Sequence, residues 1–291
     1  MTYRSSAAIS LPAISLLALL SLLLAGCQGA VTADLATNPP ADPQVSSVTV
    51  DVQGLEFERS DGSTRKLEFT TAQRLELVEL DASGDAFRLF TNEALPEGSY
   101  TGVRLLIDTE DTGTVSRSDG TQYPLQIGEG EPANVNFTVS KDKASREDLV
   151  LSLDLRRSLS FDTDTGEYTL TPRLRAVPAG TAARINGTVD QSCPAGTSLD
   201  SGGAVYLFEG HDVKPDDVGS GIEPYATTAV MTSLFDSQFT YALRFLPPGD
   251  YTIALTCNGE DDDPTTNDDV TFVLASNVTL DDDEVLEHNL P

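Results

Sequence analysis

Basic residues are scarce in this sequence. It has 18 lysines and arginines against 46 aspartates and glutamates, which gives a formal net charge of −28 at pH 7. The lysines are Lys66, Lys141, Lys143 and Lys214. Affinity for nucleic acid depends on basic side chains that neutralise phosphates, and a field of the opposite sign repels them. We therefore exclude nucleic acid as a partner and interpret the acidic surface as a solubility feature.

Histidine and the common catalytic motifs are also nearly absent. The two histidines are His211, in a predicted loop, and His288, in the last predicted strand. The sequence has no Gly-x-Ser-x-Gly elbow, His-Glu-x-x-His helix, Walker loop or Gly-x-Gly-x-x-Gly turn. Paired carboxylates for glycoside cleavage leave no sequence signature, because the two acids meet only in space. We assign no catalytic residue and predict that the protein is not an enzyme.

Of the three cysteines, Cys27 follows a long apolar run with one positive charge, Arg4, ahead of it. This order is typical of a signal peptide, and Leu24-Ala25-Gly26-Cys27 resembles the lipobox of bacterial lipoproteins. The resemblance implies that residues 1–26 are removed and that Cys27 carries three acyl chains. Gln28 in place of aspartate implies sorting to the outer membrane. The alternatives are a retained transmembrane helix, for which the run has borderline length, and an ordinary secretory signal peptide.

The remaining two cysteines, Cys193 and Cys257, form an even pair in a chain predicted to be exported. A disulfide is the most economical interpretation in an oxidising compartment. Two buried free thiols are the alternative. A disulfide here would close a long loop and so stabilise the second half of the chain.

Residues 27–44 are small, polar and proline-bearing, with Pro39, Pro40 and Pro43 and no periodicity. Such a composition predicts a flexible tether. We therefore expect this segment to lift the folded part of the protein off the membrane.

Residues 45–180 show the period of two that is typical of β-strands. Val48, Val50 and Val52 alternate with polar residues, and further alternating runs follow. Asp-Gly pairs between the runs supply the positive φ that tight hairpins need. No window shows a convincing helical period.

Residues 181–291 contain seven short predicted strands separated by polar turns, as in a small immunoglobulin-like or prealbumin-like sandwich. We predict an all-β protein with two β-sandwich domains, residues 45–180 and residues 181–291, after a cleaved lipoprotein signal peptide.

One short motif occurs in both halves. Leu95-Pro96-Glu97-Gly98-Ser99-Tyr100 parallels Leu246-Pro247-Pro248-Gly249-Asp250-Tyr251. Proline cannot extend a hydrogen-bonded ladder and glycine permits a turn, so each copy predicts a corner between strands. We expect each tyrosine to pack in the corner at the end of its sandwich.

Both predicted domains resemble known families. Around the second motif, the run Phe239–Tyr251 is similar to carboxypeptidase regulatory-like and Cna-B-type modules, which implies a prealbumin-like sandwich used in stalks and adhesive surface units. In the first half, short matches follow in order: Val48-Thr49-Val50 with Gly54-Leu55-Glu56, Leu95–Tyr100, Val103-Arg104-Leu105, Leu153-Asp154-Leu155 with Ser158, and Tyr168–Leu174. With these matches, residues 45–178 resemble the bacterial lipoprotein domain known as domain of unknown function 4382. That resemblance implies location and fold and transfers no catalytic residue.

Calcium is the one cofactor that the sequence raises. Hard cations take several carboxylate and carbonyl oxygens, and adjacent sandwich loops can pool them. The candidate ligands are Asp261, Asp262, Asp263, Asp268 and Asp269. Further acidic turns occur at Asp281–Glu284 and at Asp162–Gly166, which lacks the distal glutamate of a calcium loop. The alternative is solvated turn charge without a metal.

Taken together, these observations predict a non-catalytic lipoprotein of the outer membrane that acts as a binding or structural module. Its partners would be the membrane, through the N-terminal lipid, and a protein or glycan ligand. One alternative is a calcium-assisted or carboxylate-pair hydrolase of extracellular polymers, which predicts a concave acidic pocket. Another is a periplasm-facing scaffold, which predicts an apolar patch for a partner. The sequence does not indicate on which side of the outer membrane the domains lie.

Overall fold

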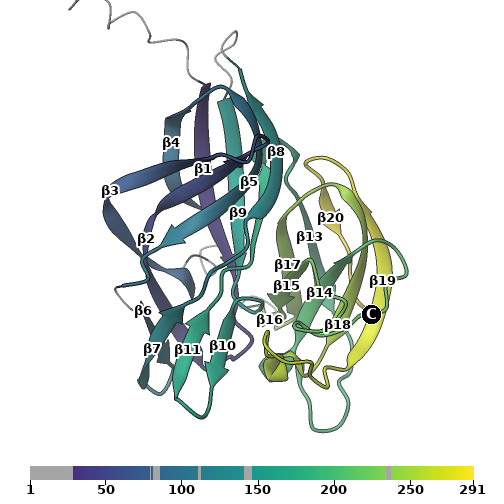
Figure 1. Ribbon diagram of the computed structural model, residues 1–291. Coiled ribbons are helices and arrows are strands. Elements are labelled where there is room, and N and C mark those ends of the chain that lie inside the picture. The colour runs from purple at the N-terminus through teal and green to yellow at the C-terminus, as the bar shows by residue number, and fades with distance from the viewer. Residues whose placement is uncertain (1–28, 79, 81–85, 111–112, 141–145, 234–236) are drawn as a thin grey trace, which may run out of the picture.

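The computed structural model describes residues 29–78, 80, 86–110, 113–140, 146–233 and 237–291, and strands dominate these residues. Two β-domains lie side by side, the first purple to teal and the second green to yellow (Figure 1). The fold is all-β, as the sequence predicts, and each domain has two sheets around a core. The lipobox residues Leu24–Gly26 and Cys27 lie outside the described residues. In the part of the chain that is described, no helix has the length and apolar character needed to cross a membrane.

The first domain is built from two sheets. A four-stranded sheet has the order β12-β9-β1-β4, and an eight-stranded sheet has the order β10-β11-β7-β6-β2-β5-β8 with β3 paired to β2. The side chains between the sheets form one hydrophobic core. The described strands of this domain are β1 (Gly29–Asn38), β2 (Val45–Arg59), β3 (Thr64–Glu76), β4 (Phe87–Leu95), β5 (Gly98–Ile107), β6 (Gly113–Arg117), β7 (Gln122–Ile127), β8 (Ala133–Val139), β9 (Arg146–Asp154), β10 (Leu159–Asp162), β11 (Glu167–Leu170) and β12 (Leu174–Pro178).

The predicted tether at residues 27–44 is wrong for most of its length. Residues 29–38 form β1, which lies between β9, its parallel neighbour, and β4, its antiparallel neighbour. Val31, Ala33 and Leu35 are fully buried. A strand that is covered on both faces lacks the alternation of apolar and polar residues that marks a half-exposed strand. The small alanine and threonine side chains of β1 make its strand pattern in the sequence weaker still. The folded domain therefore includes the residues from Gly29 onward that were predicted to form a tether.

The second domain follows a short 3₁₀ turn, η1 (Ala179–Thr181). Its two four-stranded sheets have the orders β16-β17-β13-β20 and β15-β14-β18-β19. Apolar side chains from both sheets form a separate core. The described elements are β13 (Ala183–Val189), α2 (Leu199–Gly202), β14 (Ala204–Glu209), β15 (Ala226–Ala229), β16 (Met231–Thr232), β17 (Phe239–Leu246), β18 (Gly249–Thr256), η2 (Gly259–Asp261), β19 (Phe272–Leu280) and β20 (Val285–Glu287).

The disulfide predicted from the cysteine count is present. Cys193 and Cys257 are bonded, with an S–S distance of 2.04 Å and a Cα–Cα distance of 5.8 Å. Cys193 follows the end of β13 and Cys257 follows the end of β18, so the bond joins the two sheets of the second domain.

The repeated Leu-Pro motif forms the same corner in both domains. Tyr100 and Tyr251 are buried. The Tyr100 hydroxyl donates to the Pro96 carbonyl at 2.7 Å, and the Tyr251 hydroxyl donates to the Pro247 carbonyl at 2.8 Å. A tyrosine that bonds back to the chain a few residues upstream is known from other β-sandwiches as a tyrosine corner. The predicted packing role of both tyrosines is confirmed.

Candidate metal centre

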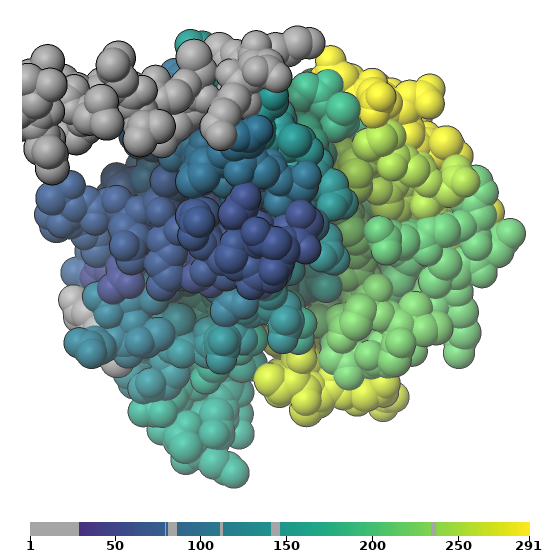
Figure 2. Space-filling model, turned by 45° about the horizontal axis from the view of Figure 1, so that its top comes forward, coloured from purple at the N-terminus to yellow at the C-terminus, as the bar shows by residue number. Residues whose placement is uncertain are grey.

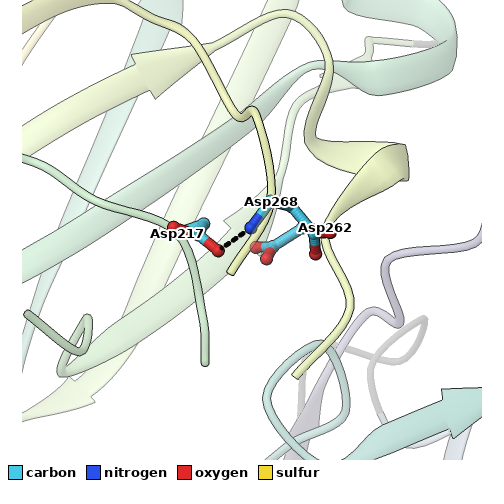
Figure 3. Close-up of side chains that lie close together, drawn as sticks. All are labelled: Asp217, Asp262 and Asp268. Atoms are coloured by element: carbon cyan, nitrogen blue, oxygen red, sulfur yellow. Dashed lines mark hydrogen bonds between the residues drawn. The ribbon is translucent and has the colours of Figure 1, made fainter. Parts of the chain in front are cut away.

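Three aspartates from two loops of the second domain meet beside the first domain. Asp217 belongs to the loop between β14 and β15, whereas Asp262 and Asp268 belong to the loop between β18 and β19. One carboxylate oxygen from each lies within 4.8 Å of the others. In Figure 3 the carboxylate of Asp217 points from one loop toward the two aspartates of the other. Asp217 is 1% exposed and Asp262 4% exposed, so two of the three carboxylates are buried.

Hydrogen bonds hold the three side chains in place. The backbone N–H of Asp268 donates to Asp217 Oδ2 at 2.5 Å (Figure 3). Asp262 Oδ1 accepts from the backbone N–H of Val218 at 3.1 Å, and Asp262 Oδ2 accepts from the Tyr206 hydroxyl. Each loop therefore supplies donors to a carboxylate of the other.

Asp268 is fixed within its own loop. Its Oδ2 accepts from the backbone N–H of Asp263 at 2.8 Å, and its Oδ1 accepts from the Thr266 hydroxyl at 2.9 Å. Gly219, on the opposing loop, has φ +87°, and a Cβ there would lie 2.3 Å from the Thr266 carbonyl oxygen. Glycine thus permits the close approach of the two loops at this point.

One oxygen in the cluster is left without a donor. Asp217 Oδ1 is buried and has no hydrogen-bond partner among the described residues. Leaving a buried polar atom unsatisfied costs about 1–3 kcal/mol, and more when the group is charged. Such an atom in a native structure calls for an explanation, such as a bound water or ion.

The electrostatics of the cluster are unfavourable for three ionised carboxylates. Burial raises the pKa of Asp262 to about 6, although the Tyr206 hydrogen bond and the charge of Arg156 act in the opposite direction. Burial also raises the pKa of Asp217, against the hydrogen bond from the Asp268 N–H, and the side chain of Asp216 adds to the rise through a hydrogen bond and its charge. Both shifts have the sign expected when burial removes solvent from the charged form.

The calcium candidates from the sequence divide into two groups. Asp262 and Asp268 are brought together, whereas Asp261, Asp263 and Asp269 are outside the cluster. Asp261 and Asp269 are exposed, and Asp263 Oδ1 accepts from the backbone N–H of Thr265 at 2.8 Å within its own turn.

The sequence pattern does not indicate the third member, Asp217. It belongs to a different loop, and no local spacing connects it to Asp262. Within the described residues, the other acidic turns form ordinary loop contacts: Asp162 accepts from the backbone N–H of Asp164 at 2.8 Å, and the Asp281 N–H donates to Glu284 at 2.8 Å.

The cluster connects to the first domain through Tyr206 and Arg156. Arg156 belongs to the turn between β9 and β10, and it is 2% exposed. Its guanidinium lies 5.7 Å from the centre of the Tyr206 ring and donates to the Gly259 carbonyl. Tyr206 in turn donates to Asp262. A single chain of contacts therefore runs from the first domain to the aspartates.

A second set of buried polar contacts joins the domains. Asp154, at the end of β9, is fully buried and accepts from the backbone N–H and the hydroxyl of Thr227, both at 2.8 Å. The Arg175 guanidinium lies 3.6 Å from the same carboxylate. Asn38, at the end of β1, donates to the Thr227 carbonyl at 2.9 Å. Buried charges are tolerated when they are paired and hydrogen-bonded, as they are here.

A cleft of about 210 Å³ lies between the domains next to the aspartates. Figure 2 shows the seam between the teal part of the first domain and the yellow loop of the second. One wall is Glu260–Asp263, and the other includes Phe161, Tyr168 and Asp42. The cleft is concave and acidic, as the hydrolase alternative expects. However, an ion pair with Arg117 at 2.7 Å offsets the charge of Asp42, the acid on the wall opposite Glu260–Asp263.

The histidines lie apart from Asp217, Asp262 and Asp268. His211 Nε2 is 3.2 Å from the carbonyl oxygen of Val278, and His288 Nε2 is 3.0 Å from Ser276 Oγ. Both contacts are to residues of β19, and neither histidine belongs to the cluster of Asp217, Asp262 and Asp268.

Residues 28–172 match the model of the family described as domain of unknown function DUF4382. The first domain is therefore a DUF4382 domain, as its resemblance implies, and the match includes β1. A search of the curated proteins finds no relative.

Solved structures give only distant similarities. The Bacillus anthracis TIE protein is 8% identical with a TM-score of 0.21; the match covers 90% of this chain, which spans only 34% of that protein. A candidate adhesin from Bacteroides ovatus ATCC 8483 is 10% identical with a TM-score of 0.23, over 90% of this chain and 93% of the other. The fimbrial anchor protein Mfa2 from Porphyromonas gingivalis is 12% identical with a TM-score of 0.21, over 85% and 82%. At these TM-scores the similarities carry no functional argument.

Proposed function

We propose that this protein is a lipid-anchored, non-catalytic module of the bacterial outer membrane that presents two joined β-sandwiches to a protein or glycan ligand. The lipobox at Leu24–Cys27 supports the anchor. The strongly acidic chain would be repelled by anionic lipid, so a covalent anchor is the means by which it would stay at the membrane.

The observation that carries the proposal is the position of β1. This buried strand begins at Gly29, directly after the predicted lipid site at Cys27 and Gln28. A lipid on Cys27 would therefore hold the DUF4382 domain close to the membrane, without the tether that we expected. The contacts of Asp154 and Asn38 with Thr227 would then fix the second domain relative to the first.

Metabolic labelling with an alkyne analogue of palmitate tests the anchor. The wild-type chain should incorporate the label, and Cys27→Ala should not. Cys193→Ser, which alters a different cysteine, is the matched control and should be labelled like the wild type. Unchanged labelling of Cys27→Ala would overturn the proposed anchor.

Protease treatment of intact and lysed cells tests the presentation of the domains. A surface module should be digested on intact cells, whereas a periplasmic control protein stays protected until lysis. Protection of this chain until lysis would contradict the surface role and favour the periplasm-facing scaffold.

A further inference from the structure

We propose that Asp217, Asp262 and Asp268 form a calcium site that fastens the two loops of the second domain to each other next to the first domain. The site is independent of the lipid anchor and of any ligand of the module. It assigns a cation to three side chains from two loops, whose carboxylate oxygens lie within 4.8 Å of one another (Figure 3).

The chemistry of the donors favours a hard divalent cation. All three ligands are carboxylates, and the group contains no histidine or cysteine. Calcium binds oxygen at 2.3–2.6 Å and tolerates irregular geometry. Two oxygens on opposite sides of one calcium ion are thus about 5 Å apart, and the three carboxylate oxygens of this group all lie within 4.8 Å of one another. Magnesium needs shorter bonds and near-ideal octahedral geometry, so calcium is the better fit.

The unpartnered oxygen is the independent evidence for a ligand. Asp217 is 1% exposed, its Oδ2 is bonded to Asp268 N–H, and its Oδ1 has no donor among the described residues. A carboxylate oxygen in this situation needs a cation, a proton or an ordered water. The carboxylate oxygens of Asp262 and Asp268 each accept one hydrogen bond already, but a carboxylate oxygen has two lone pairs, so each can also bind a metal.

Charge supports the cation over the alternatives. Arg156 is the cation that acts on Asp262, but its guanidinium is engaged with Tyr206 and the Gly259 carbonyl. Burial also disfavours the ionised forms of Asp217 and Asp262. A bound divalent ion would offset the cost of burying the ionised carboxylates. It would also stabilise the contacts that run from Asp262 through Tyr206 to Arg156.

Terbium luminescence tests the site on the full chain purified in detergent and stripped with a chelator. Terbium occupies calcium sites, and the protein has no tryptophan, so sensitised emission must come from tyrosine. Tyr206 donates to Asp262 and is the expected sensitiser. Wild-type protein should give emission that calcium displaces, and Tyr206→Phe should lose most of it; calorimetry measures how much calcium binding this variant retains.

Thermal unfolding supplies the second readout. We expect calcium to bind with a Kd on the order of 10⁻⁴ M, as in extracellular modules, and to raise the Tm of the wild type by about 3 °C or more at tenfold excess over Kd. Magnesium at the same concentration should give a smaller shift. Asp217→Asn and Asp268→Asn should weaken calcium binding at least tenfold, whereas Asp282→Asn, at an exposed turn, should bind like the wild type.

The two readouts also separate the metal from a shared proton. If the cluster holds only a proton, Asp217→Asn raises the Tm in chelator, because it removes a buried charge, and calcium shifts no variant. Wild-type protein that shows no displaceable terbium emission and no calcium-dependent Tm would overturn the proposal.

Discussion

Asp154 of the first domain accepts two hydrogen bonds at 2.8 Å from Thr227 of the second domain, one from its backbone N–H and one from its hydroxyl. The carboxylate also lies 3.6 Å from the buried Arg175 guanidinium. The Asp154 side chain therefore neutralises the buried Arg175 and accepts hydrogen bonds from a residue of β15 in the neighbouring domain.

Asp154→Ala should lower the free energy of unfolding by about 3–5 kcal/mol, because it leaves Arg175 buried without a counterion. Thr227→Val is the matched change on the other side. It removes only the hydroxyl bond and should cost about 1 kcal/mol. Urea unfolding measures both. Equal effects of the two variants would show that the charge pair contributes nothing beyond the hydrogen bond.

The tyrosine corners predict two equal and independent losses. Tyr100→Phe and Tyr251→Phe each remove one hydroxyl-to-carbonyl bond, and each should cost about 0.5–1.5 kcal/mol. Because the sites lie in separate cores, the double variant should equal the sum within about 0.5 kcal/mol. Tyr123→Phe is the control, since its hydroxyl makes no hydrogen bond with the described residues. A loss of similar size there would point to ring packing as the cause.

β1 should behave as core and not as a linker. Leu35 is fully buried in this strand, so Leu35→Ala should destabilise the protein by about 2–5 kcal/mol through lost burial and a cavity. Val285→Ala, at a side chain that is 51% exposed, should change stability by less than about 0.5 kcal/mol. Guanidinium unfolding compares them. A neutral Leu35→Ala would restore the tether interpretation.

The disulfide should stabilise the second domain by about 4 kcal/mol, because it spans 64 residues of sequence. The double variant Cys193→Ser, Cys257→Ser should show this loss in chemical unfolding without reductant. Reductant should then lower the stability of the wild type and leave the double variant unchanged. A wild type insensitive to reductant after full thiol release would contradict the prediction.

His288 should make the second domain less stable in mild acid. Burial lowers its pKa from 6.5, so between 6.5 and the lower folded-state value the unfolded chain binds more protons. Stability from this residue is thus complete above pH 6.5 and is lost as the pH falls through that window. His288→Gln should flatten the decline between pH 7 and pH 5, measured as unfolding free energy at each pH. Parallel curves for the two proteins would exclude the effect.

The sequence predicts features that depend on a short local motif or on a residue type that occurs only a few times. The corners at Tyr100 and Tyr251 follow from motifs of a few residues, and the disulfide follows from two cysteines in an exported chain. The sequence does not predict β1, because the burial of this strand depends on β9 and β4, which lie far along the chain. Asn38, at the polar end of the strand, resembles a loop residue in the sequence, because its partners Asp154 and Thr227 are also distant along the chain.

The aspartate cluster shows the same division. Asp262 and Asp268 occur in one acidic run, so composition draws attention to that loop. Asp217 joins them only because Gly219 lets a distant loop pack against Thr266. Exposure also separates Asp262 from its neighbour Asp261, and burial of this kind is set by Tyr206 and Val218 across the fold.

β1 also has a mechanical consequence. The strand runs from Gly29, two residues after Cys27 in the sequence, to Asn38, which bonds to the second domain. If Cys27 is held in a membrane and a ligand pulls on the second domain, tension passes along this strand. Its nine parallel register pairs with β9 lie across that direction and are loaded together in shear. The first domain would then transmit the tension without lengthening, whereas a flexible linker of the same number of residues would extend.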